Sequence, residues 1–115
     1  MQIDIQARDF TLTEGLRAHV ERRLRFALTR YRDCVRRITV RLADVNGPRR
    51  GADKRCLLQL RLNGLPDIIV EDIEADLYVA VDRAVSRARR TVERYQQRRR
   101  NPLNHPFQQG SDDWV

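Results

Sequence analysis

Apolar and polar residues alternate along this chain with a period that changes several times. Residues 2–7 (QIDIQA) alternate strictly, which predicts a half-buried strand with Ile3, Ile5 and Ala7 on one face. Residues 11–31 change to a helical period, so we expect an amphipathic helix there. The apolar stripe of this helix consists of Leu16, Val20, Leu24, Ala27, Leu28 and Tyr31.

Three further strands and a second helix follow. Period two returns in residues 35–45 and 54–64, and residues 67–74 predict a fourth strand after a tight turn that begins at Asn63-Gly64. The inward-facing residues are Ile38, Val40 and Leu42 in one strand, and Cys56, Leu58, Leu60 and Leu62 in the next. A long helix begins at about Asp76, and its apolar stripe consists of Leu77, Val81, Val85, Ala88, Val92 and Tyr95.

Polar residues mark where both helices start. Thr13 is a suitable N-cap for the first helix, and Thr11 with Glu14 offers a capping box one turn earlier. Asp76 is a suitable N-cap for the second helix. It ends the acidic run EDIEAD, whose carboxylates complement the positive end of the helix dipole. A metal site in this run is the alternative.

The element order β-α-β-β-β-α predicts an α+β fold in two layers. Both helices should lie on one face of a four-stranded sheet, with the last three strands forming an antiparallel meander. Residues 1–100 should form one domain, and residues 101–115 a flexible C-terminal tail because they hold two prolines and no apolar period. The Gly/Pro-containing loop at residues 46–53 (NGPRRGAD) should be mobile.

The chain is strongly basic, with a net charge of +7 and a sequence pI of about 10.6. Lys54 is the only lysine, so arginine supplies nearly all of the positive charge. All 23 basic residues but only 14 of the 16 acidic residues fall within residues 1–100, which raises the net charge there to +9. A small domain of this charge most often binds nucleic acid, and sometimes an anionic membrane surface.

The arginines of the helices are segregated to one flank. On the second helix, a band of arginines falls roughly 120° from the apolar stripe, while Asp82 and Glu93 fall on the other side. On the first helix a looser band occupies the same rotational side, opposite Glu14 and Glu21. The band on the second helix contains Arg83, Arg87, Arg90, Arg94 and Arg98, and the band on the first helix contains His19, Arg22, Arg23 and Arg30.

Like charges spaced three and four residues apart destabilise an isolated helix by a few tenths of a kcal/mol per pair, which a bound polyanion would relieve. We therefore expect these arginines to contact phosphates, with binding that weakens steeply with salt. RNA is favoured over DNA, because no helix-turn-helix is present and two helices held on a sheet offer a broad surface. An ordinary solvated helix face is the alternative.

No catalytic constellation is present, so we expect no enzymatic activity. Ser86 and Ser111 have no histidine at a suggestive spacing, and Cys56 lies in an apolar strand and should belong to the core. Cys34 and Cys56 are expected to be reduced thiols, and no metal or cofactor is expected. The first ten residues hold no signal-peptide pattern and no apolar run is long enough to span a membrane, so we expect a cytoplasmic location.

Two segments resemble the ribosome hibernation-promoting factor and ribosome-associated inhibitor A family, also called the sigma modulation protein family. The segment LTEGLRAHVERRL resembles the family's first helix, where I-T-x-[AP]-[LI]-R precedes a basic helix. The second helix resembles the family's D-M-Y-x-A-I-D motif, with Asp76, Tyr78, Ala80 and Asp82 at the same spacing. The resemblance covers residues 1 to about 100, and the chain resembles the family's short form.

The resemblance implies a fold similar to double-stranded-RNA-binding domains. It also implies a stationary-phase or stress-response factor that binds the small ribosomal subunit in the mRNA and tRNA channel. The basic helix faces would contact 16S rRNA there and stop translation. Arg23, Arg87, Arg90 and Arg94 occupy basic positions of the family's helices.

Three departures from the family pattern change the surface. Phe26 stands where the family usually has a basic residue, Thr91 replaces a glutamine, and the loop at residues 46–53 adds Arg49 and Arg50. We expect a monomer away from the ribosome, with no membrane partner and no small-molecule substrate. The rival hypotheses are a general structured-RNA-binding module, a protein-interaction module of the sigma-modulation kind, and self-association through an exposed strand edge.

Overall fold

The computed structural model of the chain describes residues 1–44 and 53–100. The tail expected at 101–115 lies outside the described residues, as does most of the loop expected at 46–53, including Arg49 and Arg50. The elements follow the order β-α-β-β-β-α, with one 3₁₀ turn after the first helix. They are β1 (Gln2–Arg8), α1 (Glu14–Leu28), η1 (Thr29–Tyr31), β2 (Val35–Asp44), β3 (Lys54–Leu62), β4 (Ile68–Glu74) and α2 (Leu77–Arg100).

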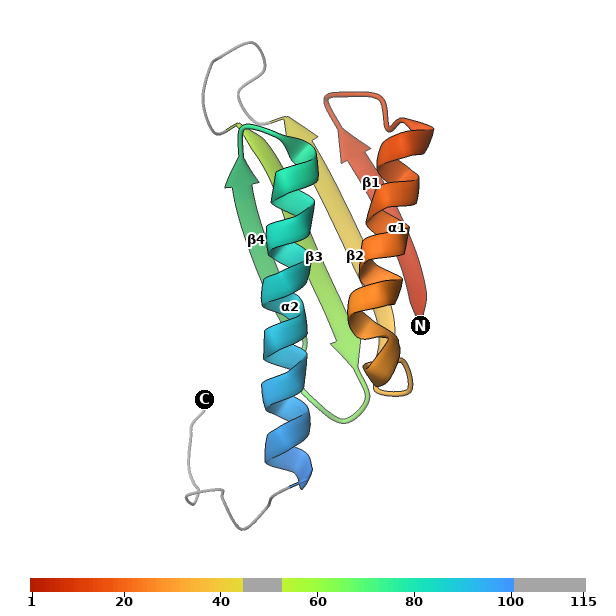
Figure 1. Cartoon of the computed structure of the whole chain (residues 1–115), viewed down its shortest axis with the longest axis vertical. Coiled ribbons are helices and arrows are strands. Elements are labelled where there is room, and N and C mark those ends of the chain that lie inside the picture. Colours follow the sequence, from red (N-terminus) through yellow and green to blue (C-terminus); the bar gives the residue numbers. More distant parts are fainter. Residues whose placement is uncertain (45–52, 101–115) are drawn as a thin grey trace.

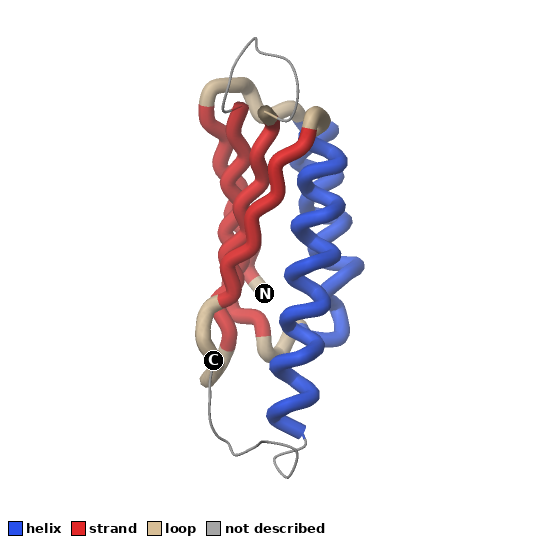
Figure 2. The backbone as a smooth tube through the Cα atoms, turned by 90° about the vertical axis from the view of Figure 1, so that its left-hand side faces the viewer, coloured by secondary structure: helices blue, strands red, loops and turns tan. Residues whose placement is uncertain are grey.

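The four strands form one sheet in the order β1-β2-β3-β4. β1 pairs with β2 in parallel, and β2, β3 and β4 form the expected antiparallel meander. Both helices run in the same direction across one face of this sheet (Figure 1). In the edge view the helices form one layer and the strands the other, and none of the described helices lies on the far face of the sheet (Figure 2). The predicted two-layer α+β fold is therefore confirmed.

Side-chain caps fix where each helix begins. The backbone N–H of Leu16 donates to Oγ1 of Thr13 (3.1 Å), which confirms Thr13 as the N-cap of α1. The capping box expected at Thr11 is wrong, because α1 starts at Glu14, directly after its Thr13 cap. At the other helix the N–H of Tyr78 donates to Oδ1 of Asp76 (2.8 Å), which confirms that cap as well.

The core lies between the two layers and is built from the predicted apolar stripes. Burying each such leucine or valine side chain contributes about 1.5–3 kcal/mol, so these contacts dominate the stability of the domain. Small residues on α2 let this helix approach β3 and β4 closely. The fully buried residues include Val20, Leu24 and Leu28 of α1, Ile38, Val40, Leu58 and Leu60 of the sheet, and Ala80, Val81, Ala84, Val85, Ala88 and Val92 of α2.

The turn between β3 and β4 is the tight turn predicted at Asn63-Gly64. Gly64 has a φ of +69°, a conformation that glycine adopts without steric cost. Nδ2 of Asn63 donates to the carbonyl of Asp33 (2.9 Å), and the Asn63 N–H donates to the carbonyl of Cys34 (2.9 Å). These two bonds join the turn to the segment between α1 and β2, which fixes that end of the sheet beneath α1.

Candidate nucleic-acid interface

The arginine band of α2 projects over the outer strand β4. Nη1 of Arg83 lies 3.7 Å from Oε2 of Glu74, and Nη1 of Arg87 lies 3.6 Å from Oδ2 of Asp72. Nη1 of Arg87 also donates to the carbonyl of Glu71 (2.7 Å). The first half of the band is therefore held against the acidic run that precedes the helix.

The two carboxylates under these arginines also affect each other. A side-chain hydrogen bond with Asp72 raises the pKa of Glu74, and partial burial adds to the shift, while the positive charge of Arg83 opposes it. The close pair of carboxylates lies at the end of β4 that faces α2. It makes this corner of the surface less positive than the number of nearby arginines indicates, and a phosphate there would meet negative as well as positive charge.

Two members of the basic band of α1, His19 and Arg23, point toward α2. Nε2 of His19 lies 2.8 Å from Oδ1 of Asp82, and Nε of Arg23 donates to the same oxygen (3.1 Å). The His19 ring also lies against the ring of Tyr78, with centroids 4.8 Å apart. Beyond the end of α1, the Tyr31 hydroxyl donates to Oε2 of Glu93 (3.3 Å).

These contacts explain why both helices carry their charges on one rotational side. α1 and α2 are parallel neighbours (Figure 1), and His19 and Arg23 on the basic flank of α1 reach Asp82 on the acidic flank of α2. Asp82 and Glu93 therefore join the helices, and the basic flank of α2 is left on the outside. The two predicted bands do not merge into one surface, since part of the first is paired between the helices and part of the second stands over β4.

The eight predicted RNA-binding arginines fall into two groups. Arg23, Arg83 and Arg87 form the ion pairs given above, and Arg98 has an interaction of its own. In residues 1–44 and 53–100, the remaining four have no carboxylate at ion-pair distance, and Nη2 of Arg94 reaches only the Thr91 hydroxyl (3.5 Å). These four are Arg22, Arg30, Arg90 and Arg94, all of which are exposed.

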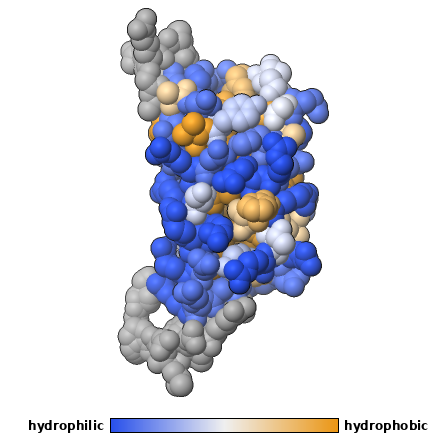
Figure 3. Space-filling model, in the orientation of Figure 1, coloured by the Kyte–Doolittle hydropathy of each residue, from blue (hydrophilic) through white to orange (hydrophobic). Residues whose placement is uncertain are grey.

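Phe26 is the most exposed large apolar residue among those described. Its exposed fraction is 80%, and it lies on α1 between Arg22 and Arg30, one helical turn from each. The helix layer is mostly hydrophilic, and its apolar side chains appear as separate patches among charged ones (Figure 3). An isolated aromatic ring between arginines is an arrangement that can stack on a nucleic-acid base.

Sequence reasoning missed a second set of arginines. They lie on the face of the sheet opposite the two described helices, and they are Arg8, Arg37, Arg41, Arg55 and Arg61. The signal was present, because these residues fall in the polar phase of the same alternation that predicts the core positions. The polar residues of an alternating strand therefore indicate an exposed face as directly as its apolar residues indicate the core.

Cys56, the groups that could bind a metal ion and the possible membrane spans are the other features to consider. Cys56 is fully buried, as predicted, and burial raises the pKa of its thiol to about 12. Among the residues described, no three His, Cys, Asp or Glu side chains form a group that could hold a metal ion. None of the described helices is long and apolar enough to cross a membrane.

The fold and its charged surface define a small basic α+β domain with segregated arginines on a two-helix layer. The chain belongs to the family described as Sigma 54 modulation protein / S30EA ribosomal protein, which matches residues 3–100. This confirms the resemblance drawn from the two helices, and the family is one of ribosome-associated factors and not an enzyme class.

Several solved structures are similar to the chain, among them the following two. The N-terminal domain of Protein Y from Thermus thermophilus is 33% identical, with a TM-score of 0.65, and the match covers 82% of this chain and 94% of that one. A ribosomal subunit interface protein from Coxiella burnetii is 20% identical, with a TM-score of 0.70, covering 84% of this chain and 99% of that one, and supports the fold alone. A comparison with individually curated proteins gave no significant match.

Proposed function

We propose that this chain is a ribosome hibernation factor that binds the small ribosomal subunit. In this proposal, residues 1–100 form the binding domain, and the helix layer contacts 16S rRNA in the channel used by mRNA and tRNA. Occupying that channel would exclude both ligands and stop translation in the cytoplasm under stress or in stationary phase. The role of residues 101–115 as a flexible tail stays a prediction.

The segregation of arginine on α2 is the observation that carries this proposal. Arg90 and Arg94 project from an outer flank with no carboxylate at ion-pair distance within the described residues. Guanidinium groups donate in a planar fork that matches phosphate oxygens, and charge-assisted hydrogen bonds are stronger than neutral ones. Family membership makes ribosomal RNA the polyanion to test first.

Contacts on α1 would add to those on α2. Arg22 and Arg30 are exposed on the same layer, and Arg23 is held by Asp82 so that its guanidinium has a fixed direction. Arg83 and Arg87 stand over Glu74 and Asp72, so we rank them below Arg90 and Arg94 as phosphate contacts.

Sedimentation of purified protein with ribosomes, at low and high salt, tests this proposal. Wild-type protein should travel with small subunits or whole ribosomes at low salt and be released at high salt. An Arg90→Gln/Arg94→Gln variant should bind more weakly and be released from ribosomes at a lower salt concentration than wild type. An Arg17→Gln/Arg25→Gln variant is the matched control, because it removes the same charge from exposed positions of α1 outside the predicted band.

Each rival hypothesis predicts a different result. A general RNA-binding module would bind free duplex RNA as well as it binds ribosomes. A protein-interaction module would stay at the top of the gradient even at low salt and would bind an acidic protein without needing the helix arginines. Self-association would appear as a dimer in light scattering without ribosomes. Failure of the wild-type protein to travel with ribosomes at low salt would overturn the proposal.

A further inference from the structure

The open face of the sheet carries a second basic surface, which we call the sheet face. Rows of residues across the strands define it, because paired residues point to the same side. One row reads Arg8, Ala43, Arg55 and Ile73, and the next reads Gln6, Arg41, Leu57 and Glu71. The third reads Asp4, Thr39, Gln59 and Ile69, and the last reads Gln2, Arg37 and Arg61.

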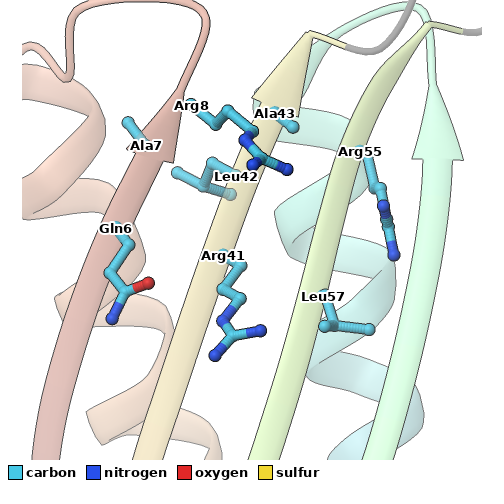
Figure 4. A pocket seen from close by; sticks show the side chains of 8 residues that line it. All are labelled: Gln6, Ala7, Arg8, Arg41, Leu42, Ala43, Arg55 and Leu57. Atoms are coloured by element: carbon cyan, nitrogen blue, oxygen red, sulfur yellow. The ribbon is translucent and has the colours of Figure 1, made fainter.

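The arginines of the sheet face gather around two hollows. The larger hollow, about 420 Å³, is lined by three arginines and by smaller or apolar residues, among them Arg8, Arg41, Arg55, Ala43 and Leu57. In Figure 4 these three arginines come from three successive strands, with the helices behind the sheet. The smaller hollow, about 120 Å³, is lined by Arg37, Thr39, Gln59 and Arg61.

Only part of this charge is neutralised within the domain. Arg37 lies 3.4 Å from Oδ2 of Asp4, and Arg55 forms an ion pair with Glu71. In residues 1–44 and 53–100 no carboxylate lies at ion-pair distance from the other three, which are Arg8, Arg41 and Arg61. The sheet face therefore keeps an excess of positive charge at both hollows.

We propose that the sheet face binds a second segment of RNA backbone, separate from the one that contacts the helix layer. This inference rests on the proposed function and extends it to a face with no assigned role. Arg37 and Arg41 are four residues apart on one strand, or about 13 Å. A chain that reaches both hollows must therefore extend over more than one of its phosphate groups.

The arrangement fits a polyanion better than the other possible occupants. A single small anion would fill one hollow and leave the other unused. A second copy of this chain would bring its own arginines against these five, and like charges face to face are unfavourable. The small side chain of Ala43 and the neutral Thr39 and Gln59 leave room between the guanidinium groups for a sugar-phosphate chain.

We expect the two basic surfaces to bind different segments of RNA. They lie on opposite sides of a two-layer domain whose shortest Cα dimension is 16 Å. RNA held on both sides would make the domain a wedge between two backbone segments. Removing either surface should then weaken binding without abolishing it, since the other surface remains.

Directed cleavage of rRNA from each face tests the inference. We would place one new cysteine on the sheet face (Thr39→Cys) and, in a second protein, one on α2 (Ser86→Cys), and attach an iron chelate that cleaves nearby RNA. Native Cys34 and Cys56 are buried, so labelled wild-type protein is the background control. Both probes should cleave 16S rRNA in ribosome complexes, at two different sets of nucleotides.

The outcomes separate this inference from the function on which it rests. Cleavage from Ser86→Cys alone would overturn the sheet-face proposal and leave the hibernation proposal standing. Cleavage from neither probe, together with failure of the unlabelled wild-type protein to travel with ribosomes, would overturn both. Cleavage of the same nucleotides from both probes would also overturn the proposal, because two opposite faces would not then bind separate segments.

A variant series measures how much the sheet face contributes. Replacing Arg8, Arg41 and Arg61 with Gln should weaken ribosome binding at least tenfold and lower the slope of log K against log salt by about 2–3. The matching triple Lys variant keeps the charge and should retain most of the affinity, which guards against a folding defect. Arg17→Gln/Arg25→Gln/Arg32→Gln is the control, since its sites are exposed and lie off the sheet face.

An acidic partner protein is the competing occupant, and two probes distinguish it. Single-stranded RNA and polyglutamate would be titrated against the wild-type protein and the triple Gln variant. Loss of RNA binding in the variant supports the inference. Loss of polyglutamate binding with RNA and ribosome binding unchanged would overturn it.

Discussion

The helix layer and the sheet face both carry many arginines, yet their carboxylates come from different places. On the helix layer the partners lie on a different element that packs beside the helix, as with Arg23 of α1 and Asp82 of α2, or Arg83 of α2 and Glu74 of β4. On the sheet face they lie on the neighbouring strand, as with Arg37 and Asp4. The helix pairs hold the elements together, whereas the sheet pairs orient side chains across one surface.

The difference shows that counting arginines does not locate an anion-binding surface. Exposed ion pairs contribute only about 0–1 kcal/mol, so a phosphate can compete for the guanidinium. The carboxylate stays in place, however, and repels that phosphate. Positions without a nearby carboxylate are therefore the better candidates, and both faces have some: Arg90 and Arg94 on one, Arg8 and Arg41 on the other.

The largest expected effect comes from weakening both faces together. A variant with Arg90, Arg94, Arg8 and Arg41 all changed to Gln should bind ribosomes at least 100-fold more weakly than wild type. Each pair should account for at least tenfold, because one hydrogen bond to a charged group contributes about 1.5–3 kcal/mol and the effects of distant sites add. Affinity is measured by sedimentation at several salt concentrations. If the quadruple variant binds as tightly as the Arg90→Gln/Arg94→Gln variant, the sheet face contributes nothing to ribosome binding.

A smaller effect should separate the two halves of α2. Changing Arg83 and Arg87 to Gln should reduce ribosome affinity less than threefold, because both stand over Asp72 and Glu74. The same change should raise the pKa of Glu74 further, since in the wild-type protein the charge of Arg83 lowers that pKa. Carbon-13 NMR of the Glu74 carboxyl measures that shift. Equal losses of affinity for the Arg83/Arg87 and Arg90/Arg94 pairs would contradict the ranking by local charge.

Much of the fold could be predicted because it depends on local patterns. Period two and period 3.6 indicate the strands and helices in order, and the caps at Thr13 and Asp76 follow from short-range hydrogen bonds. The capping box at Thr11 failed because two overlapping start signals compete within four residues. Sequence alone does not decide which of two such signals the packed helix uses.

The candidate site was harder to predict because its contacts are long-range. The sequence places Asp82 opposite the arginine band of α2, but only the packing of the helices brings His19 and Arg23 to it. Locating the sheet face from the sequence requires two predictions, namely strand alternation and the placement of both helices on one side of the sheet. Together these predictions indicate an open basic surface around Arg41, although neither does so alone.

The substitution Phe26→Arg should sharpen the comparison by adding charge to the helix layer alone. Phe26 is 80% exposed, so its loss should leave the melting temperature nearly unchanged. A new phosphate contact would steepen the slope of log K against log salt by about 0.7 and raise affinity a few-fold. A salt titration of ribosome binding checks this. Weaker binding would instead show that the Phe26 ring itself contacts RNA, and Phe26→Tyr should then restore it.

The smallest effect concerns the thiol that lies between the two layers. Burial raises the pKa of Cys56 from 9.0 to about 12, so the folded protein keeps its proton while the unfolded chain loses it. Stability from this group should be complete below pH 9 and fall above it, by at most about 1.4 kcal/mol per pH unit, until about pH 12.

The difference between wild type and Cys56→Ala in denaturant unfolding from pH 8 to pH 11 isolates this contribution. Subtraction is needed because Lys54, whose pKa is raised by its bonds to Asp44 and Asp53, also loses stabilising charge in this range. The Ala variant should be less stable at pH 8 because of the cavity, and its deficit should shrink as pH rises. Rapid reaction of Cys56 with a thiol reagent at pH 8.5 in the native protein would show that the layers separate readily. Neither basic surface could then be treated as part of a rigid wedge.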